Sequence, residues 1–273
     1  MKSGQPLKGV IFDWAGTLVD FGSLAPVQGF VRLFEEQGVG VTVEQARMPM
    51  GLPKRDHIVA LATLPGVAEQ WHERFGRAFT ESDADRLLAI FEPMSARAAL
   101  DRSQLIPGVL DCLAVLRADG LLIGSTTGYT RSIMHGVLAS AAHQGFTPDT
   151  IVCTDEVPQG RPSPLAIYRC MLDLCLWPAS ALVKVDDTAP GLAEGTAAGC
   201  WTVGVLASGN AVGLDIDAYH ALTAPQRTAA LAAARIALDG AGAHELVESV
   251  ADLPSALERI RVRIDAGETP WAR

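Results

Sequence analysis

The sequence is poor in basic residues and cysteines, and it has no long uncharged hydrophobic run. Its 22 lysines and arginines are outnumbered by 31 aspartates and glutamates, which gives a formal net charge of -9. Because there is no basic stripe, neither a nucleic acid nor an anionic membrane is expected as a partner. No stretch is long enough to span a bilayer and the first eight residues have no apolar signal core, so we expect a cytoplasmic protein.

The cysteines form no pattern that would build a disulfide framework or a zinc site. They are odd in number, scattered and without C-x-x-C spacing. We expect them to be buried small hydrophobic residues. They are Cys112, Cys153, Cys170, Cys175 and Cys200. At 273 residues and 49% hydrophobic content, the chain has ample material for a large core in one or two domains.

Helix and strand patterns divide the sequence into two parts. An apolar strand at 10–12 is followed, between about Phe21 and Asp101, by helical patterns without a convincing strand. Helices are expected there at 27–37, from Thr42 with Gln45 completing a capping box, at 54–64 and at 83–100. From 105 onward, helices alternate with strands at 121–125, 150–153, 182–185, 201–205 and 245–249.

This alternation predicts an α/β fold with a doubly wound, parallel, Rossmann-like sheet. A helical segment inserted directly after the first strand would lie over the strand ends as a cap. We therefore predict a catalytic core domain formed by residues 1–21 and 104–273, and a small helical cap domain formed by residues 22–103.

Polar residues follow four of the predicted strands. Asp13 ends the first, and the segments at 126–128, 160–162 and 186–188 carry hydroxyls, an arginine and two carboxylates. Taken alone, Asp13 could equally cap a following helix. Together, at one edge of a parallel sheet, these groups suit a divalent cation and a phosphoryl group. The pattern predicts phosphoryl transfer without a P-loop.

The order of these four segments, with a cap after the first, resembles the haloacid dehalogenase superfamily. In that superfamily the first aspartate attacks phosphorus and forms an aspartyl-phosphate. The resemblance implies that Asp13 is the nucleophile, Thr127 the hydroxyl and Arg161 the cation. It also implies that Asp186 and Asp187 are metal carboxylates.

One position departs from most phosphatases and mutases of the superfamily. They have a second aspartate two residues after the nucleophile, which protonates a leaving oxygen, whereas this chain has Ala15. A phosphatase without that acid would be slow. The substrate is therefore expected to have a leaving group that needs no proton from that side.

The predicted cap contains a lysine with unusual surroundings. The stretch 48–57 places Lys54 at a helix start, with Pro53 suited to the first helical position. An unperturbed lysine, with a pKa of ~10.4, is a free amine in only about one molecule in 2,500 at pH 7. The helix terminus, Arg55 and a closed apolar site would each lower that pKa. We expect Lys54 to form an imine.

Ala15 and Lys54 together resemble the phosphonoacetaldehyde hydrolase family, the phosphonatases. The motif D-W-A-G-T at 13–17 and the segments at 48–54, 124–130, 157–162 and 198–205 match that family, so the resemblance spans nearly the whole chain. It implies a hydrolase that cleaves the carbon-phosphorus bond of phosphonoacetaldehyde to acetaldehyde and phosphate, in the degradation of 2-aminoethylphosphonate. A Schiff base on Lys54 would accept the electrons of the broken bond, which explains why no acid is needed at Ala15.

The resemblance also implies a magnesium site. Asp13, the backbone carbonyl of Ala15 and Asp187 would hold Mg²⁺. Related enzymes have glycine at the position of Asp186 and an aspartate at the position of Gly191. We hypothesise that Asp186 replaces the outer carboxylate that is missing at Gly191.

Further residues are implied as substrate-binding residues by the resemblance: Met50, Gly51, His57, Gly128 and Tyr129. Judged from the residues alone, Met50 could be a core residue, His57 a packing or surface residue, and Tyr129 packing at a helix start. In this family the cap also mediates a homodimer, so a homodimer is expected here.

Two other functions stay open at this level. One is a phosphomonoester phosphatase or phosphomutase of the same superfamily, against which Ala15 and Lys54 argue. The other is a catalytically dead binding protein that kept the fold, against which the four intact polar segments argue.

Overall fold

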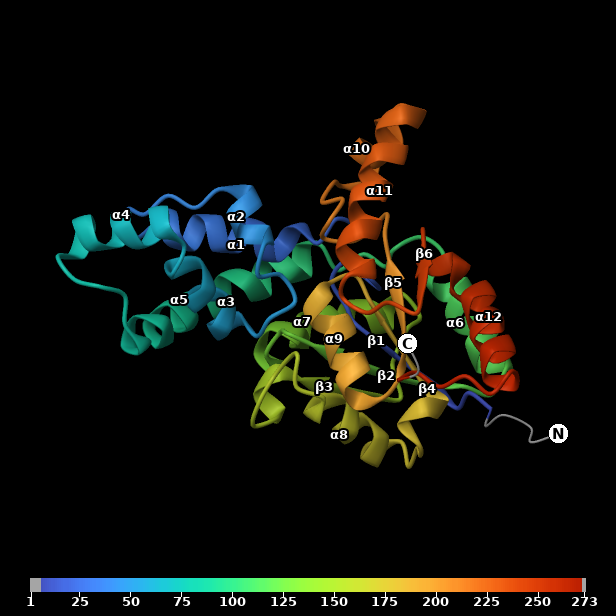
Figure 1. The fold of residues 1–273 in the computed structure, drawn as a ribbon. Coiled ribbons are helices and arrows are strands. Elements are labelled where there is room, and N and C mark those ends of the chain that lie inside the picture. The colour runs from blue at the N-terminus through green and yellow to red at the C-terminus, as the bar shows by residue number, and fades with distance from the viewer. Residues whose placement is uncertain (1–5, 272–273) are drawn as a thin grey trace.

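The structure is a computed structural model, and it describes residues 6–271. One sheet of six parallel strands forms its centre, in the order β3-β2-β1-β4-β5-β6 (Figure 1). The strands are β1 (Gly9–Phe12), β2 (Leu122–Thr127), β3 (Thr150–Cys153), β4 (Leu182–Asp186), β5 (Trp201–Val205) and β6 (Glu245–Val247). The predicted parallel α/β core is confirmed.

Strand β1 lies in the middle of the sheet. All four of its residues are buried, and Phe12 is in register with Ser125 of β2 and Val185 of β4. Because the three strands run in the same direction, the residues that follow Phe12, Ser125 and Val185 reach the same edge of the sheet. The register thus decides that the polar strand ends are neighbours.

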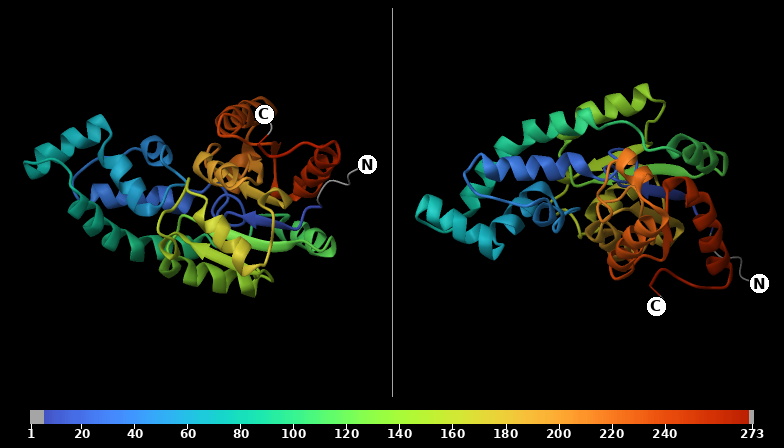
Figure 2. Two further views of the ribbon diagram at one scale, coloured as in Figure 1. Left: turned by 60° about the horizontal axis from the view of Figure 1, so that its bottom comes forward. Right: turned by 90° about the horizontal axis from the view of Figure 1, so that it is seen from above.

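Helices cover both faces of the sheet (Figure 2). One face packs against α6 (Val109–Ala118), α7 (Arg131–His143) and α12 (Leu253–Asp265). The other face packs against α8 (Leu165–Asp173) and α9 (Ala189–Ala198). Beyond β5, the chain forms α10 (Ile216–Ala221) and α11 (Ala224–Asp239), and α11 packs its buried residues against α9 and β6.

A helical segment, residues 24–101, separates β1 from α6 and lies to one side of the sheet (Figure 1). It contains α1 (Leu24–Glu35), α2 (Val43–Arg47), α3 (Lys54–Ala62), α4 (Pro65–Phe75) and α5 (Glu81–Asp101). It has its own hydrophobic core, which includes Phe30, Phe34, Ile58, Trp71 and Phe91. Helix α5 also packs against α7, so the segment is anchored to the sheet's outer layer.

The helices of this segment differ from the sequence prediction at α1 and α4. Helix α1 begins at Leu24 instead of 27, because Pro26 lies in the first turn, where a proline does not interrupt the hydrogen bonds. Helix α4 was not among the predicted helices, and only Val67 and Trp71 of its residues are buried. The predicted capping box between Thr42 and Gln45 is confirmed.

The cysteine prediction is right at four positions and wrong at Cys175, which is exposed. Cys175 lies just after α8 with a φ of 54°, in a turn where its neighbour Leu174 is only half-buried. A tight turn at the surface cannot bury every side chain, so Cys175 is exposed although cysteine is usually a buried residue.

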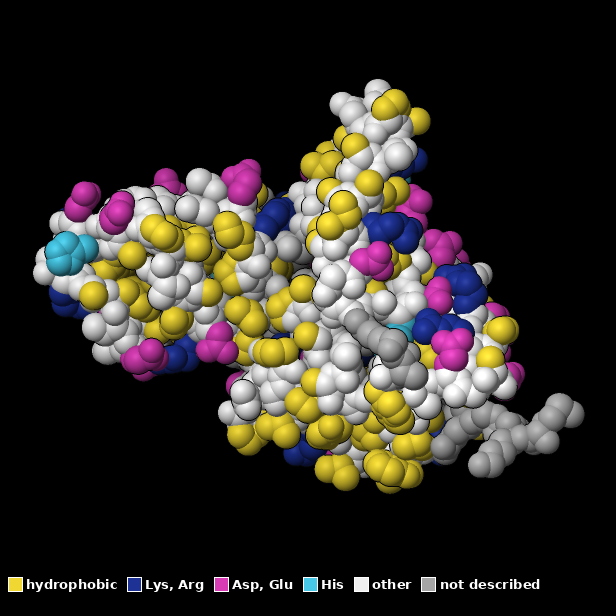
Figure 3. Space-filling model, viewed as in Figure 1, with side chains coloured by type: hydrophobic (Ala, Val, Ile, Leu, Met, Phe, Trp, Pro, Cys, Tyr) yellow, Lys and Arg dark blue, Asp and Glu magenta, His cyan; other side chains and the backbone are white. Residues whose placement is uncertain are grey.

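Charges of both signs are interspersed on the face of the molecule drawn in Figure 3, where lysines and arginines lie among aspartates and glutamates. Within residues 6–271, no helix combines the length and the apolar character that crossing a membrane requires.

Candidate active site

The polar strand ends meet at one edge of the sheet. Asp13 follows β1 directly, and its backbone N–H donates to the carbonyl of Val185 on β4 (2.9 Å). Arg161, on the loop after β3, reaches Asp13 with Nη1 at 2.8 Å from Oδ1. Thr127 is the last residue of β2, and its hydroxyl accepts the backbone N–H of Tyr129 (3.1 Å). The structure therefore brings together residues that are far apart in the chain, such as Asp13 and Arg161.

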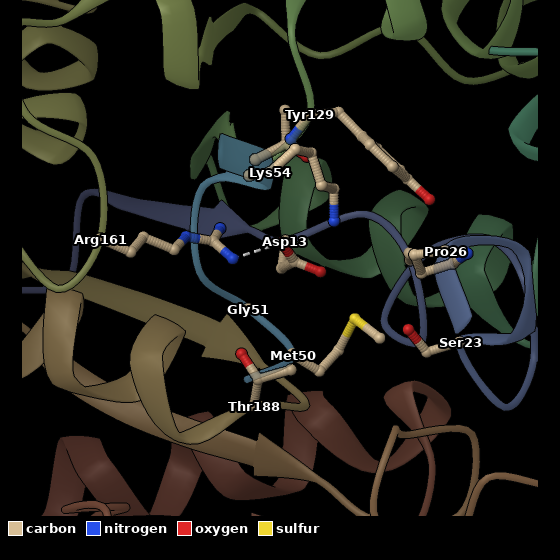
Figure 4. A pocket seen from close by; sticks show the side chains of 12 residues that line it. Asp13, Ser23, Pro26, Met50, Gly51, Lys54, Tyr129, Arg161 and Thr188 are labelled. Carbon is tan, nitrogen blue, oxygen red and sulfur yellow. Dashed lines mark hydrogen bonds and ion pairs between the residues drawn. The ribbon is translucent and has the colours of Figure 1, made fainter. Parts of the chain in front are cut away.

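A small cavity of about 20 Å³ lies between this edge and the helical segment. It is lined by Asp13, Ala15, Ser23, Pro26, Met50, Gly51, Lys54, Thr127, Gly128, Tyr129, Arg161 and Thr188. In Figure 4 the Lys54 side chain points toward the Asp13 carboxylate, and Arg161 approaches that carboxylate from another side. A single water needs roughly 10–15 Å³. The cavity is thus closed to anything much larger than water.

Lys54 is the first residue of α3, and Pro53 precedes it as the N-cap instead of taking the predicted first helical position. The side chain is 5% exposed, and its Nζ lies 4.5 Å from the centre of the Tyr129 ring. Burial lowers the pKa of Lys54 to about 8, with the charge of Arg161 acting in the same direction and that of Asp13 opposing it. A pKa near 8 keeps a useful share of the amine neutral at physiological pH.

Three carboxylates form a cluster beside the cavity. Asp13, Asp186 and Asp187 each offer an oxygen, and these oxygens lie within 4.8 Å of one another. Burial and the charge of Asp186 raise the pKa of Asp13 to about 6, and burial and the charge of Asp13 raise the pKa of Asp187 well above its usual range. Carboxylates that repel each other in this way favour a divalent cation between them. The donor set therefore fits a hard metal ion.

The outer part of this cluster is shaped by a glycine. A Cβ atom placed on Gly191 would lie 1.9 Å from Oδ2 of Asp186, so the Asp186 carboxylate occupies the space where a side chain at 191 would begin. Oδ1 of Asp186 accepts the hydroxyl and the backbone N–H of Thr188 (2.7 and 3.0 Å). Burial opposes its ionisation, but Arg161 and Lys184 hold the pKa of Asp186 below its usual value.

Of the residues implied to bind substrate, four line the cavity and one does not. Met50, Gly51, Gly128 and Tyr129 are in its wall, whereas His57 lies behind it. The Nε2–H of His57 donates to the carbonyl of Ala46 (2.9 Å), and the ring stacks on Phe30. Burial and the charge of Lys54 lower the pKa of His57 well below its usual value, so the ring is neutral.

The sequence reasoning missed several residues at the site. Pro26 lines the cavity, and nothing in its local pattern indicated this. Glu194 and Lys184 are buried behind Arg161. They did carry a signal, because Glu194 is the only charged residue of α9 and Lys184 lies in a strand whose other residues before Asp186 are apolar.

One arginine of α2 bonds the helical segment to the loops at residues 22 and 210–213. Arg47 donates to the carbonyls of Gly22 (3.1 Å) and Gly213 (3.0 Å) and to Oδ1 of Asn210 (3.0 Å). Asn210 in turn donates its backbone N–H to Oδ2 of Asp187 (2.8 Å). These bonds link the helical segment to the loop that orients a carboxylate of the cluster.

Comparisons with known proteins agree with this geometry. A family model described as a haloacid dehalogenase-like hydrolase matches residues 7–199. The phosphonoacetaldehyde hydrolase of Paraburkholderia phytofirmans is 47% identical over 264 residues, which cover 97% of this chain and 99% of that protein. The phosphonoacetaldehyde hydrolase of Bordetella pertussis is 44% identical, with 97% and 96% covered.

A solved structure shares the whole fold. The crystal structure of a phosphonoacetaldehyde hydrolase-like protein from Oleispira antarctica superimposes with a TM-score of 0.97 at 40% sequence identity, and the match covers 99% of this chain and 98% of that one.

Proposed function

The chain belongs to the phosphonoacetaldehyde hydrolases of the haloacid dehalogenase-like hydrolases, and from this premise we propose that it cleaves phosphonoacetaldehyde through a Schiff base on Lys54 and an aspartyl-phosphate on Asp13. The products are acetaldehyde and phosphate. The reaction would serve the degradation of 2-aminoethylphosphonate, after its amine has been converted to the aldehyde. The observation that carries the proposal is a buried lysine of lowered pKa facing a buried carboxylate in one closed cavity.

The chemistry requires both residues. Direct cleavage of the carbon-phosphorus bond would expel a carbanion, which is a poor leaving group. In the proposed route, the Lys54 amine condenses with the aldehyde and releases water, which gives an iminium. Asp13 then attacks phosphorus, and the electrons of the broken bond pass into the iminium to form an enamine. Protonation and hydrolysis of the enamine release acetaldehyde, and water hydrolyses the aspartyl-phosphate.

The surroundings of Asp13 support this route over a phosphatase route. Arg161 lies against the carboxylate and would bind a phosphoryl oxygen, as would the hydroxyl of Thr127. Ala15 lines the cavity where a phosphatase of this superfamily has its acid. Because the enamine departs as a carbon group, no leaving oxygen needs a proton from that position.

We propose that Mg²⁺ is held by Asp13, the carbonyl of Ala15 and Asp187, with Asp186 as the outer carboxylate. The three clustered carboxylates support this assignment, and the overlap between Asp186 and the space beside Gly191 supports the replacement hypothesis. When bound, the ion would offset negative charge between the nucleophile and the phosphonate.

The cavity wall supports the proposed substrate contacts. Met50, Gly51, Gly128 and Tyr129 would surround the aldehyde and the phosphonate. His57 is buried and neutral behind Lys54, so we propose that it tunes the lysine through packing and polarity without touching the substrate.

We propose that residues 22–103 act as a cap over a core of residues 1–21 and 104–273. A cavity of about 20 Å³ is too small for the substrate, so the helical segment must move to admit it. The resemblance further suggests a homodimer through this cap, which sedimentation analysis would measure.

The test is phosphate release from phosphonoacetaldehyde with Mg²⁺, combined with borohydride trapping and peptide mass analysis. We expect turnover and a reduced ethyl or phosphonoethyl adduct on Lys54. The sequence has lysine only at positions 2, 8, 54 and 184, so the adduct is easily assigned. Hydrolysis of phosphomonoesters without turnover of phosphonoacetaldehyde and without an adduct would instead identify a phosphatase.

A further inference from the structure

Every nitrogen of the Arg161 guanidinium has a defined partner in the protein. Nε donates to Oε2 of Glu194 (3.0 Å), and Nη2 donates to the carbonyl of Thr126 (2.9 Å). Nη1 lies 2.8 Å from Oδ1 of Asp13 and 3.4 Å from Oδ2 of Asp186. A planar guanidinium held at three corners has one orientation, and here that orientation directs Nη1 at the proposed nucleophile.

Glu194 is an unusual residue for its place. It lies in the middle of α9, whose other residues carry no charge, and it is 1% exposed. The next residue, Gly195, permits this burial, because a Cβ there would lie 2.7 Å from the Cβ of Lys184 and would push α9 away from β4. Burying an isolated carboxylate is unfavourable, so the partners of Glu194 must offset that cost.

Glu194 lies in a buried hydrogen-bond network. The Thr126 hydroxyl donates to Oε2 of Glu194 (2.9 Å) and accepts from Lys184 Nζ (2.8 Å) and Arg161 Nη2 (3.1 Å). Lys184 also lies 3.4 Å from Oε2 of Glu194 and 3.1 Å from Oδ2 of Asp186. Lys184 thereby offsets the charge of both acids, which leaves Nη1 of Arg161 closer to Asp13 than to Asp186.

We propose that Glu194, supported by Thr126 and Lys184, is a positioning residue that holds the Arg161 guanidinium in place to receive the phosphoryl group. None of the three lines the cavity, so each acts through Arg161. A donor that is already oriented does not have to be reorganised when charge develops on the phosphoryl oxygens. The inference rests on the proposed function, in which Arg161 meets that group.

The first test replaces the charge and keeps the shape, with Glu194→Gln. We expect kcat to fall about 10- to 100-fold, which is less than the ~10²- to 10³-fold loss typical of removing a transition-state donor outright. We also expect weaker binding of inorganic phosphate in the presence of Mg²⁺, measured by calorimetry, because Arg161 is no longer fixed. Normal kcat and normal phosphate affinity would overturn the proposal, whatever the thermal stability.

A second variant separates positioning from stability. Glu194→Gln combined with Lys184→Met removes one buried charge of each sign, so the thermal stability lost in the single variant should recover at least in part. We expect kcat and phosphate affinity to stay low. If kcat and phosphate affinity recover together with thermal stability, the proposal is overturned. If the single variant does not fold, this double variant alone decides between the two outcomes.

A matched control lies in the helical segment. Asp83 is also a buried carboxylate paired with an arginine, Arg77 at 2.6 Å, but it is remote from the cavity. Asp83→Asn should lower stability and leave kcat unchanged. Phosphate affinity can be measured whether or not the protein cleaves phosphonoacetaldehyde. Wild-type protein that fails to cleave it would overturn the proposed function. The calorimetry would still decide the role of Glu194.

Discussion

Replacement of Lys54 by arginine tests the proposed Schiff base directly. The pKa of about 8 leaves about one Lys54 amine in ten neutral at pH 7, against about one in 3,000 for a lysine at its ordinary pKa of 10.5. Burial thus increases the reactive form by roughly 300-fold. Lys54→Arg keeps the positive charge, but a guanidinium stays protonated and forms no imine. We expect turnover to be abolished.

The assay follows both trapping and turnover against pH. In the wild-type chain, the rate of borohydride trapping should rise as pH increases and level off above about 8, because only the neutral amine attacks the aldehyde. The arginine variant should give no adduct at any pH. Its affinity for inorganic phosphate should stay near that of the wild type, which would show that the site is still assembled.

Lys8→Arg is the matched control for this experiment. Lys8 is remote from the cavity and its Nζ donates to the carbonyl of Trp177, so the same substitution there should change neither turnover nor trapping. Turnover by Lys54→Arg, or a wild-type adduct on another lysine, would refute the imine assignment. A trapping rate that still rises steeply above pH 10 would refute the argument from burial.

Three further predictions concern stability, metal binding and closure. Lys54→Met should raise the free energy of unfolding at pH 7 by up to about 3 kcal/mol, because a pKa lowered from 10.5 to about 8 means that folding buries a charge. In urea denaturation this gain should shrink as pH rises from 8 to 10.5, because in that range Lys54 has lost its proton in the folded wild type and still holds it in the unfolded chain. A gain that stays constant with pH would contradict the lowered pKa of Lys54. Asp186→Gly and Gly191→Asp should each weaken Mg²⁺ binding in calorimetry, the second because the new side chain collides with Asp186. The double variant should recover part of the lost Mg²⁺ affinity. Unchanged affinity in Asp186→Gly would remove this residue from the metal site. Arg47→Met removes the bonds that would hold the helical segment over the site in the proposed cap closure, so it should raise KM several-fold and speed hydrogen exchange in α2. Arg32→Met loses only an exposed ion pair and should change neither quantity.

Local patterns were enough to predict the fold and several residues of the candidate site. Asp13 follows directly after an apolar strand, and the sequence of that strand alone is enough to recognise its position. Most helices and strands were located to within a few residues for the same reason. The elements that were missed, α4 and α10, bury only one or two residues each.

Residue types alone decided which chemistry is available to this chain: a carboxylate after the first strand, alanine in place of the acid, and a lysine in the inserted segment. Only the tertiary structure decided how those groups behave. The pKa of Lys54 depends on burial by Tyr129 and on Asp13, and the space beside Gly191 is filled by Asp186. Glu194 meets Arg161 across 33 positions of sequence. Solvation and Coulomb energies depend on distances in space, and distances between remote segments are set only when the sheet register and the packing of helices on it are formed.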